Sequence, residues 1–470
     1  MNDIINNLLD FSDQEFCIEG SQKFTWKDAF QNVVSITKFF HDSGLNKDSV
    51  VAIDINKDNI TYSAILACYC NGITFVPVDF ISIGDSQTIP DIISPQVFLT
   101  SKKTYDMDEH NIVLISDLVE PIDFVDNDNR VAFISEPRRG AIAYIMQSSG
   151  STGVPKVIPI SYDNLHAYLD SVELVAALSS NTIFAQTVSL TFDLSIHDMF
   201  LSFRKKGTLL PLSASIAKFA PRFMCQYGAH NIMAVPSFYD LMASTGIVIP
   251  SVKNVFICGE ALRKEVATKV CTMFPNADVY NFYGPTEATV AISYYKILSS
   301  NISDDDIVPI GRPFPGSKLL LSETGELLLG GNQIFSGYLE QNDKNPFVSI
   351  GRDIFYKSGD LCSFDGRNYK FLSRIDFQIK YRGYRLELEG VEATLAKHFE
   401  GDFAAIGFNQ TSPGNFDDLA IFYDNIKISK SDLSRVLPRH FSGANFIFID
   451  NICRNSSGKI DRKSLLRAVV

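Results

Sequence analysis

The sequence lacks an excess of basic residues, and this absence limits the partners that the protein can have. Lysine and arginine together number 42, against 54 aspartates and glutamates, so the formal net charge at pH 7 is -12. Nonspecific binding to nucleic acid depends on a basic surface, and we find no basic stripe with interleaved aromatic residues. We therefore expect no nucleic-acid partner.

Membrane-spanning and secretory segments are also missing. The longest uncharged stretch, residues 59–78, contains Asn71, Gly72 and Pro77, which suits a buried helix and strand better than a membrane span. The first residues place acids among their leucines and have no basic start, so we expect no signal peptide. The eight cysteines form no CxxC pairs beside histidines, which is typical of a reduced chain. We expect a cytoplasmic protein without membrane insertion.

What the sequence does contain is a long alternation of helical and strand-like patterns. With 470 residues, 46% of them hydrophobic, the chain is long enough for a large core and more than one domain. The patterns predict helices at residues 26–43, 59–70, 162–177, 198–203 and 238–243, and strands at 50–55, 74–78, 141–146, 182–186, 208–211 and 231–235. This alternation predicts an α/β fold with parallel or mixed sheets covered by helices.

The secondary-structure pattern changes in the last third of the sequence. From about Ile307, short strand-like runs with glycine and proline between them predict a small antiparallel or barrel-like layer. A densely charged segment, residues 373–388, then precedes a region with its own apolar strands. We place a domain boundary there, which gives a large domain of residues 1–375 and a small α+β domain of residues 376–470 that begins at Asp376.

The segment QSSGSTGVPK, which ends at Lys156, is the first candidate site. Its backbone amides and hydroxyl groups can surround phosphate oxygens, and the lysine can neutralise them. The spacing differs from a Walker loop, because only two residues separate Gly150 from Gly153. A flexible surface turn is the alternative interpretation.

Two carboxylates follow glycine turns farther along the chain. In NFYGPTEATV, Glu287 can hold Mg²⁺ against triphosphate oxygens, since that ion prefers one or two carboxylates plus phosphate. Alternatively, it only starts a helix. In YKSGDL, Asp360 can accept both hydroxyl groups of a ribose, although an ordinary hairpin turn explains the same residues.

Two further charged residues have open interpretations. Asp193 lies between apolar residues in FDLSIHDMF and needs a cation or several donors, which a substrate ammonium group would supply. Capping of a helix by Asp193 or Ser195 is the alternative. Lys459 follows a flexible SSG near the end of the sequence, where a lysine is usually a solvated charge.

The order and spacing of these five segments resemble the adenylate-forming superfamily, in particular amino-acid adenylation domains and D-alanine:carrier-protein ligases. The resemblance is carried by SSGSTGVPK, FDLS, ICGE, NFYGPTEATVA, YKSGDL, SRIDFQIKYRGYRLELEGVE and NSSGKIDRK, and it covers nearly the whole chain. It implies that ATP activates a small amino acid as an aminoacyl adenylate, which then passes to the phosphopantetheine thiol of a carrier protein. It also implies that the small C-terminal domain is mobile, with its hinge at Asp376.

The resemblance assigns roles to individual residues. Lys459 would bridge the substrate carboxylate and the α-phosphate, and Glu287 would bind Mg²⁺. Asp360 would bind the ribose with help from Arg374. The residues expected to bind ATP are Ser148, Ser149, Gly150, Ser151, Thr152, Gly153, Lys156, Asn281, Phe282, Tyr283, Gly284, Thr286, Asp360, Arg374 and Lys459. Of these, Lys156, Thr286 and Lys459 are expected to be catalytic together with Glu287.

The resemblance also outlines an amino-acid pocket. Asp193 matches the acid that pairs with the substrate ammonium, and the side-chain pocket would contain Leu194, His197, Ala234, Phe256, Cys258, Phe282, Val290 and Ala291. Phe282 and Cys258 leave little room, so we expect a small amino acid such as alanine, with D-alanine first. His197 is unexpected beside a methyl side chain, and it favours either a serine or acidic substrate or a satisfied core histidine.

Several departures from the family pattern keep other functions open. Val157 and Ser373 stand where glycine is usual, which motivates a non-catalytic nucleotide-binding homologue. An acyl-CoA ligase is a further alternative that Asp193 opposes, and a ligase for a polar or acidic L-amino acid in a secondary-metabolite pathway is another. Since no carrier segment follows before Val470, we expect the carrier to be a separate protein.

Overall fold

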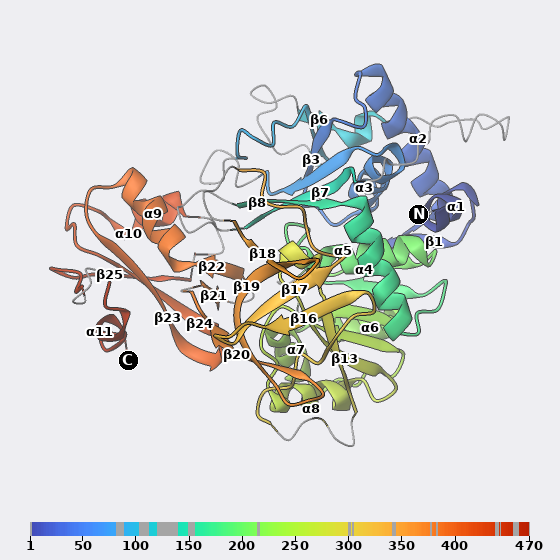
Figure 1. The fold of residues 1–470 in the computed structure, drawn as a ribbon. Coiled ribbons are helices and arrows are strands. Elements are labelled where there is room, and N and C mark those ends of the chain that lie inside the picture. Colours follow the sequence, from blue (N-terminus) through green and yellow to red (C-terminus); the bar gives the residue numbers. More distant parts are fainter. Residues whose placement is uncertain are drawn as a thin grey trace.

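In the computed structural model, two large sheets and the helices packed between them form most of the chain (Figure 1). The described residues are 2–80, 89–102, 112–119, 140–148, 156–213, 217–298, 302, 305–340, 345–376, 378–381, 384–437, 441, 443–454 and 460–469.

The first large sheet has six strands in the order β6-β5-β3-β4-β7-β8. These strands are β3 (Val50–Asp54), β4 (Thr74–Val78), β5 (Val97–Thr100), β6 (Ile112–Leu114), β7 (Ile142–Ser148) and β8 (Lys156–Ser161). All neighbours are parallel except β7 and β8, which form an antiparallel hairpin whose last pair is Ser148 with Lys156. The hairpin therefore holds both ends of the glycine-rich segment at the edge of this sheet.

The second large sheet has nine strands in the order β15-β14-β13-β12-β11-β9-β10-β1-β2. They are β1 (Glu15–Glu19), β2 (Gln22–Thr25), β9 (Ile183–Gln186), β10 (Thr208–Pro211), β11 (Asn231–Ala234), β12 (Asn254–Ile257), β13 (Asp278–Tyr283), β14 (Ser293–Ile297) and β15 (Arg312–Pro313). The run from β10 to β13 is parallel. The carboxyl ends of these strands meet at one edge, where ligands of open α/β sheets usually bind.

The helices between and around the sheets follow the predicted alternation. They are α1 (Asn2–Leu9), α2 (Trp26–Asp42), α3 (Asn59–Asn71), η1 (Ile115–Asp117), α4 (Tyr162–Val175), α5 (Leu194–Arg204), α6 (Ala220–Tyr227), α7 (Pro236–Ala243), α8 (Lys264–Met273) and η4 (Thr286–Ala288). Nearly every residue of α3 and α5 is buried, as expected for a helix that is covered on all sides.

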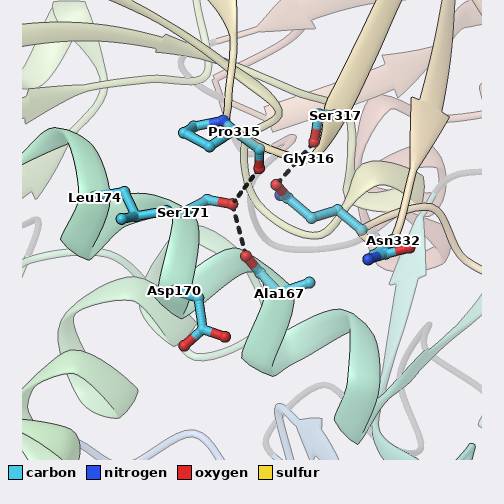
Figure 2. Close-up of a pocket in the computed structure, with 9 residues that line it drawn as sticks. Ala167, Asp170, Ser171, Leu174, Pro315, Gly316, Ser317 and Asn332 are labelled. Atoms are coloured by element: carbon cyan, nitrogen blue, oxygen red, sulfur yellow. Dashed lines mark hydrogen bonds between the residues drawn. The ribbon is translucent and has the colours of Figure 1, made fainter.

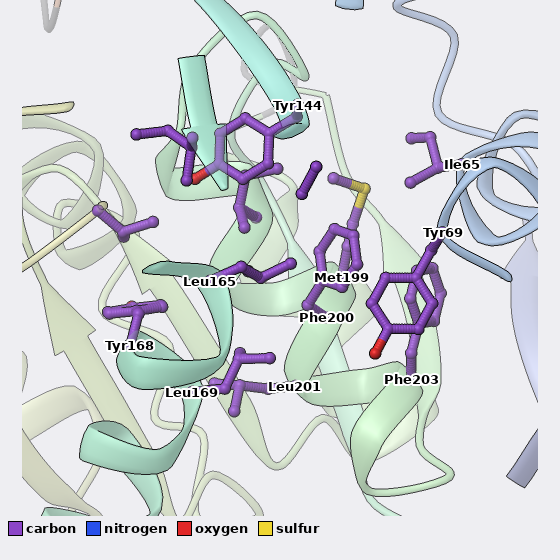
Figure 3. Packing of buried hydrophobic residues seen from close by; sticks show 14 of the residues in the cluster. Ile65, Tyr69, Tyr144, Leu165, Tyr168, Leu169, Met199, Phe200, Leu201 and Phe203 are labelled. Carbon is purple, nitrogen blue, oxygen red and sulfur yellow. The ribbon is translucent and has the colours of Figure 1, made fainter. Parts of the chain in front are cut away.

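The main hydrophobic core lies where α3, α4 and α5 pack against one another (Figure 3). Tyr69 of α3, Leu165 of α4 and Phe200 of α5 are all almost completely buried, and the Tyr69 and Phe200 rings lie 5.6 Å apart. This packing fixes α5, whose first turn carries the predicted substrate residues.

A small antiparallel sheet follows, as predicted for the region after Ile307. Its strands are β16 (Ser317–Leu321), β17 (Glu326–Gly331), β18 (Phe347–Ile350), β19 (Asp353–Phe364) and β20 (Tyr369–Arg374). Strands β19 and β20 bring Asp360 directly opposite Arg374.

The C-terminal segment forms a separate sheet in the order β22-β21-β24-β23, with β25 beside β24. Its elements are β21 (Gln378–Tyr381), β22 (Tyr384–Glu387), α9 (Leu388–His398), β23 (Phe403–Ser412), β24 (Asn415–Tyr423), α10 (Lys430–Val436), β25 (Asn445–Phe448) and α11 (Arg462–Leu466). Two apolar clusters there consist only of C-terminal residues. Figure 1 shows this sheet to one side of the rest of the chain.

The structure agrees with the predicted α/β architecture and corrects several boundaries: the helix predicted at residues 238–243 begins at Pro236, and the strand predicted at 141–146 is Ile142–Ser148. The helix predicted at residues 198–203 begins at Leu194, because polar residues in its first turn hid the apolar pattern. All eight cysteines are unpaired. Within the part of the chain that the structure describes, no helix is both long and apolar enough to cross a membrane.

Candidate active site

Glu287 lies in a buried turn directly after β13. It is fully buried, and the hydroxyl group of Tyr338 donates a hydrogen bond of 2.8 Å to its Oε1 atom. The alternative prediction, that Glu287 starts a helix, is confirmed only in part, because Glu287 lies in a single 3₁₀ turn, η4. A buried carboxylate with a neutral donor retains its attraction for a cation.

Gly284 and two strained residues give this turn its shape. A Cβ atom on Gly284 would lie 2.6 Å from the Cα atom of Ala291, so only glycine fits. Thr289 and Val290 have positive φ angles of 57° and 68°, which β-branched residues rarely adopt. The Thr289 hydroxyl donates to the Gln333 carbonyl at 2.6 Å, and Gln333 Nε2 donates to the Ala291 carbonyl at 2.5 Å. Gln333 therefore holds the turn from outside.

Gln333, which bonds to this turn, also lines a pocket (Figure 2). The pocket is lined by Ala167, Asp170, Ser171, Leu174, Pro315, Gly316, Ser317, Asn332 and Gln333. The Ser317 hydroxyl donates to Gln333 Oε1 at 3.2 Å, and the Ser171 hydroxyl donates to the Ala167 carbonyl at 2.7 Å. None of the predicted site residues lines it, so we treat it as a separate surface feature.

Lys156 is the first residue of β8 and lies close to Tyr338. Its Nζ atom is 5.8 Å from the centre of the Tyr338 ring and 2.5 Å from Oε1 of Glu387. Tyr338 thus touches both Lys156 and Glu287, two residues that the sequence predicts to bind triphosphate and metal. Val157, the next residue, is fully buried in β8, where a β-branched side chain is favourable.

Asp360 lies in a strand, and the prediction that it occupies a glycine turn is wrong. It sits within β19, one residue after Gly359, whose φ angle of 73° kinks the strand without reversing it. The Tyr283 hydroxyl donates to Asp360 Oδ2 at 2.5 Å, and Arg374 Nη1 lies 2.5 Å from Oδ1. Burial and the nearby carboxylate raise the pKa of Tyr283 well above its usual value, so this hydroxyl stays protonated and donates.

Arg374 connects this cluster to the start of the C-terminal segment. Its Nε and Nη2 atoms donate to the two carboxylate oxygens of Asp376, each at 2.7 Å. The predicted ribose residue and the predicted hinge residue are thus joined through one guanidinium group.

Asn281 precedes this cluster on β13. Its side chain donates to the carbonyl groups of Val308 and Pro309 at 3.4 and 2.9 Å. These bonds fix the strand end that leads to Phe282 and Tyr283.

Asp193 lies at the N-terminal end of α5 with 9% of its surface exposed. The capping alternative is wrong for this residue, because its side chain makes no capping hydrogen bond to the helix. Of the predicted pocket residues, one set belongs to a single buried cluster, namely Leu194, Phe256, Cys258, Phe282, Val290 and Ala291. Ala234 is buried in the neighbouring cluster.

His197 is fully buried within this group. The Tyr168 hydroxyl lies 2.6 Å from Nδ1, the ring of Phe256 is 4.4 Å away, and the ring of Phe282 is 6.2 Å away. Burial lowers the pKa of His197 from 6.5 to about 3, so the ring is neutral. Its Nε2 atom has no hydrogen-bond partner among the described residues.

Other predicted residues lie outside the described residues. These are Ser149, Gly150, Ser151, Thr152, Gly153 and Lys459, together with the side chain of Ser148. Thr286 is described and is the first residue of η4. Beyond Lys459, the Nη2 atom of Arg462 lies 2.6 Å from Glu392, and its Nε atom donates to the Ala405 carbonyl.

Sequence reasoning missed Tyr338, Lys380 and Glu387. Lys380 Nζ donates a hydrogen bond to the carbonyl group of Gly259, directly after the predicted pocket residue Cys258. Both charged residues lie in the segment that the sequence marked only as a charged boundary. Their contacts join distant parts of the chain, and no local pattern reports them.

Comparison with known proteins gives consistent matches along the chain. The family described as AMP-binding enzyme matches residues 7–339. The D-alanine--D-alanyl carrier protein ligase of Lactococcus lactis is 30% identical over 95% of this chain and 94% of its own length. The ligase of that name from Bacillus licheniformis is 26% identical and covers 96% of both chains.

Solved structures share the fold. The Vibrio cholerae adenylation domain AlmE, in complex with glycyl-adenosine-5'-phosphate, superposes with a TM-score of 0.84 at 24% identity, covering 100% of this chain and 97% of that chain. The o-succinylbenzoate CoA synthetase of Bacillus subtilis superposes with a TM-score of 0.81 at 18% identity, covering 99% and 98%.

Proposed function

The chain belongs to the family of AMP-binding enzymes, and we propose that it activates a small amino acid with ATP and transfers it to a carrier protein. In the first step, a carboxylate oxygen of the amino acid attacks the α-phosphorus, and pyrophosphate leaves. In the second, the phosphopantetheine thiol of a separate carrier attacks the carbonyl carbon, AMP leaves and the thiol proton is released. The relatives named D-alanine--D-alanyl carrier protein ligase support this reaction class.

The observation that carries the proposal is that Tyr338 contacts both Lys156 and Glu287. It brings a cation from β8 to the ring of Tyr338 and a buried carboxylate from the turn after β13 to the hydroxyl group of the same tyrosine. A triphosphate with a metal ion needs both charges, whereas a purely structural cluster of this kind would need neither the fully buried acid nor the lysine.

Magnesium fits the groups that are present. Among the described residues, no group of three or more His, Cys, Asp or Glu side chains could hold a metal without help from a ligand. Mg²⁺ commonly binds one or two carboxylates together with substrate phosphates, and Glu287 supplies such a carboxylate. A bound ion would neutralise charge on the triphosphate.

The remaining predicted residues have roles that this geometry supports. Asp360, oriented by Tyr283 and Arg374, accepts hydrogen bonds from the ribose hydroxyl groups. The buried carboxylate of Asp193 attracts the ammonium group of the amino acid beside a small apolar pocket. No general base is needed in the first step, because the attacking carboxylate is already ionised at neutral pH.

Catalysis of the first step is assigned to Lys459. The negative charge that gathers at the phosphorus is stabilised by a cation placed there in advance. Residues 1–375 and 376–470 act as two domains joined at Asp376, which agrees with the separate sheet and apolar clusters of the C-terminal segment. We place the reaction in the cytoplasm, where ATP is available.

The identity of the amino acid is the second part of the proposal. The apolar residues favour alanine, and D-alanine comes first because of the relatives. One observation favours a polar substrate instead, since His197 brings an imidazole with an unsatisfied Nε2 atom into the same group of residues.

An ATP–pyrophosphate exchange assay with both enantiomers of each amino acid, and with glycine, tests the proposal. Exchange with D-alanine alone would support the alanylation reaction. Exchange with serine or an acidic amino acid would make His197 a specificity residue. Absence of exchange with every amino acid would refute the proposed activity and favour a non-catalytic nucleotide-binding protein. A thiol-acceptor assay with coenzyme A in place of the carrier separates an acyl-CoA ligase from a carrier ligase.

A further inference from the structure

Two charged residues of the C-terminal segment reach the candidate active site. Glu387, at the end of β22, forms an ion pair with Lys156 at 2.5 Å, although 231 residues separate them in the sequence. Lys380 of the neighbouring strand β21 donates to the Gly259 carbonyl. Figure 1 shows β21 and β22 on the side of the C-terminal sheet that faces the small sheet with β19.

The ion pair is largely shielded from water. The exposed fractions of the two side chains are 25% for Lys156 and 10% for Glu387. Gln378 also donates to Oε1 of Glu387 at 3.5 Å. Pairs of this kind are costly to break by removal of one partner, because the remaining charge stays buried without compensation.

Lys156 is held by Glu387 in the structure but is expected to bind phosphate during the reaction. Under the proposed function, this lysine holds oxygens of the β- and γ-phosphates. In the structure, a carboxylate from the other domain holds the same ammonium group. A triphosphate and Glu387 carry charges of the same sign, so they compete for Lys156 and repel one another.

The ion pair between Glu387 and Lys156 also bears on the position of the C-terminal tail, residues 455–470, which contains Lys459. Arg462, three residues beyond Lys459, is bound to Glu392 and to the carbonyl group of Ala405 on β23. Strands β22 and β23 are the two ends of the sheet order β22-β21-β24-β23. The Ala405 contact of the tail is therefore at the opposite end of this sheet from β22, whereas the Glu392 contact lies on α9. Figure 1 shows α11 on the far side of the sheet from β21 and β22, so the tail does not accompany β22 to Lys156.

We propose that Glu387 is a positioning residue that takes the place of pyrophosphate on Lys156 and holds the C-terminal domain in the orientation for the transfer step. This inference rests on the proposed function. While triphosphate occupies Lys156, Glu387 is excluded and the domain is free to bring Lys459 to the site. Departure of pyrophosphate releases Lys156, and Glu387 then binds it, so that β21 and β22 replace the tail at the site.

Two native cysteines allow a direct test of the orientation. Cys225 on α6 and Cys453 in the C-terminal domain are exposed, whereas Cys17, Cys68, Cys70, Cys258 and Cys362 are buried. Replacement of the partly exposed Cys271 by serine leaves one label site on each domain. Spin labels at Cys225 and Cys453 then report the distance between the domains in the full chain by pulsed electron resonance.

The expected results concern inorganic pyrophosphate and one matched pair of variants. Pyrophosphate alone should shift the distance distribution of the wild-type chain, and Glu387→Gln should show that shift without any ligand. Glu389→Gln, two residues away on the exposed side of α9, should behave as wild type. A distribution that neither pyrophosphate nor Glu387→Gln changes would overturn the proposal.

Half-reactions give a second measurement. Loss of a hydrogen bond between charged groups should slow transfer of the preformed adenylate to the carrier about tenfold in Glu387→Gln, while ATP–pyrophosphate exchange persists. Equal loss of both half-reactions would contradict a positioning role. If the wild-type chain shows no exchange with any amino acid, the proposed function fails, and the label distances still decide whether Glu387 and pyrophosphate compete.

Discussion

Protonation of His197 should destabilise the folded protein in mild acid, and the size of the effect follows from its burial. The folded-state pKa is lowered from 6.5 to about 3. A histidine with a depressed pKa contributes stability that is fully present above pH 6.5 and is lost as the pH falls toward 3. At about 1.4 kcal/mol per pH unit, acidification from pH 7 to pH 5 should cost about 2 kcal/mol through this residue alone.

Urea denaturation of the wild-type chain and of His197→Asn at pH 7 and pH 5 measures this term. Asparagine offers the Tyr168 hydroxyl a polar partner near the position of Nδ1 but does not titrate. The free energy of unfolding should fall by about 2 kcal/mol more in the wild type than in the variant. His166, whose pKa burial lowers to about 4, is present in both proteins, so its contribution cancels.

The matched control is His41→Asn. His41 is exposed, with 83% of its side chain accessible, and this change should leave the pH dependence as in the wild type. An equal loss of stability in wild type and His197→Asn would show that the folded state does not lower the pKa of His197. The inference that burial against Phe256 and Phe282 disfavours the charged ring would then be wrong.

Three further substitutions test the assigned roles. Lys459→Ala should reduce ATP–pyrophosphate exchange by about 100-fold or more while ATP binding by calorimetry persists, and an equal loss of both would contradict a catalytic role. Lys430→Ala, on the exposed face of α10, is its control. Asp193→Ala should raise the KM for the amino acid by at least about 30-fold with little change for ATP, and unchanged amino-acid affinity would exclude the ammonium contact. Tyr283→Phe should raise the KM for ATP about tenfold through the lost bond to Asp360; an unchanged value would show that Asp360 needs no support.

Much of the fold is encoded in local patterns that a single sequence displays. The strand predicted at residues 74–78 has these bounds in the structure, because a continuous apolar run follows a helix that ends at a glycine in the left-handed conformation, Gly72. The antiparallel layer after Ile307 was also predictable, since glycine and proline separate its strands.

The candidate site was predictable where a motif carries the charged group and its neighbours together. Lys156, Glu287 and Asp360 are all in such motifs. The residues that contact them in the folded chain lie outside these motifs. Tyr338 contacts both Lys156 and Glu287 from the segment between β17 and β18, which carries no motif of its own. Glu387 contacts Lys156 only because two segments that are distant in the sequence approach one another in space, which no spacing in the sequence records.

The same reasoning explains the wrong prediction for Asp360. Glycine before an acid is a common turn signal, yet Gly359 here uses its positive φ angle to bend β19 beside Arg374. A Cβ atom at Gly359 would lie 2.7 Å from Arg374 Nη2, so a larger residue there would displace the guanidinium group that binds Asp360. Pairing with the next strand, β20, therefore decided the outcome.

The strained turn at Thr289 and Val290 has a consequence for laboratory evolution. Each left-handed β-branched residue holds the native backbone at a cost of about 1–3 kcal/mol, which glycine or asparagine at the same position would relieve. Val290 is fully buried, however, and loss of its side chain would cost about 1.5–3 kcal/mol, which offsets that relief. A screen that rewards only heat resistance should therefore neither favour nor remove valine strongly. Because Val290 also belongs to the predicted amino-acid pocket, variants at this position should differ in substrate choice more than in stability.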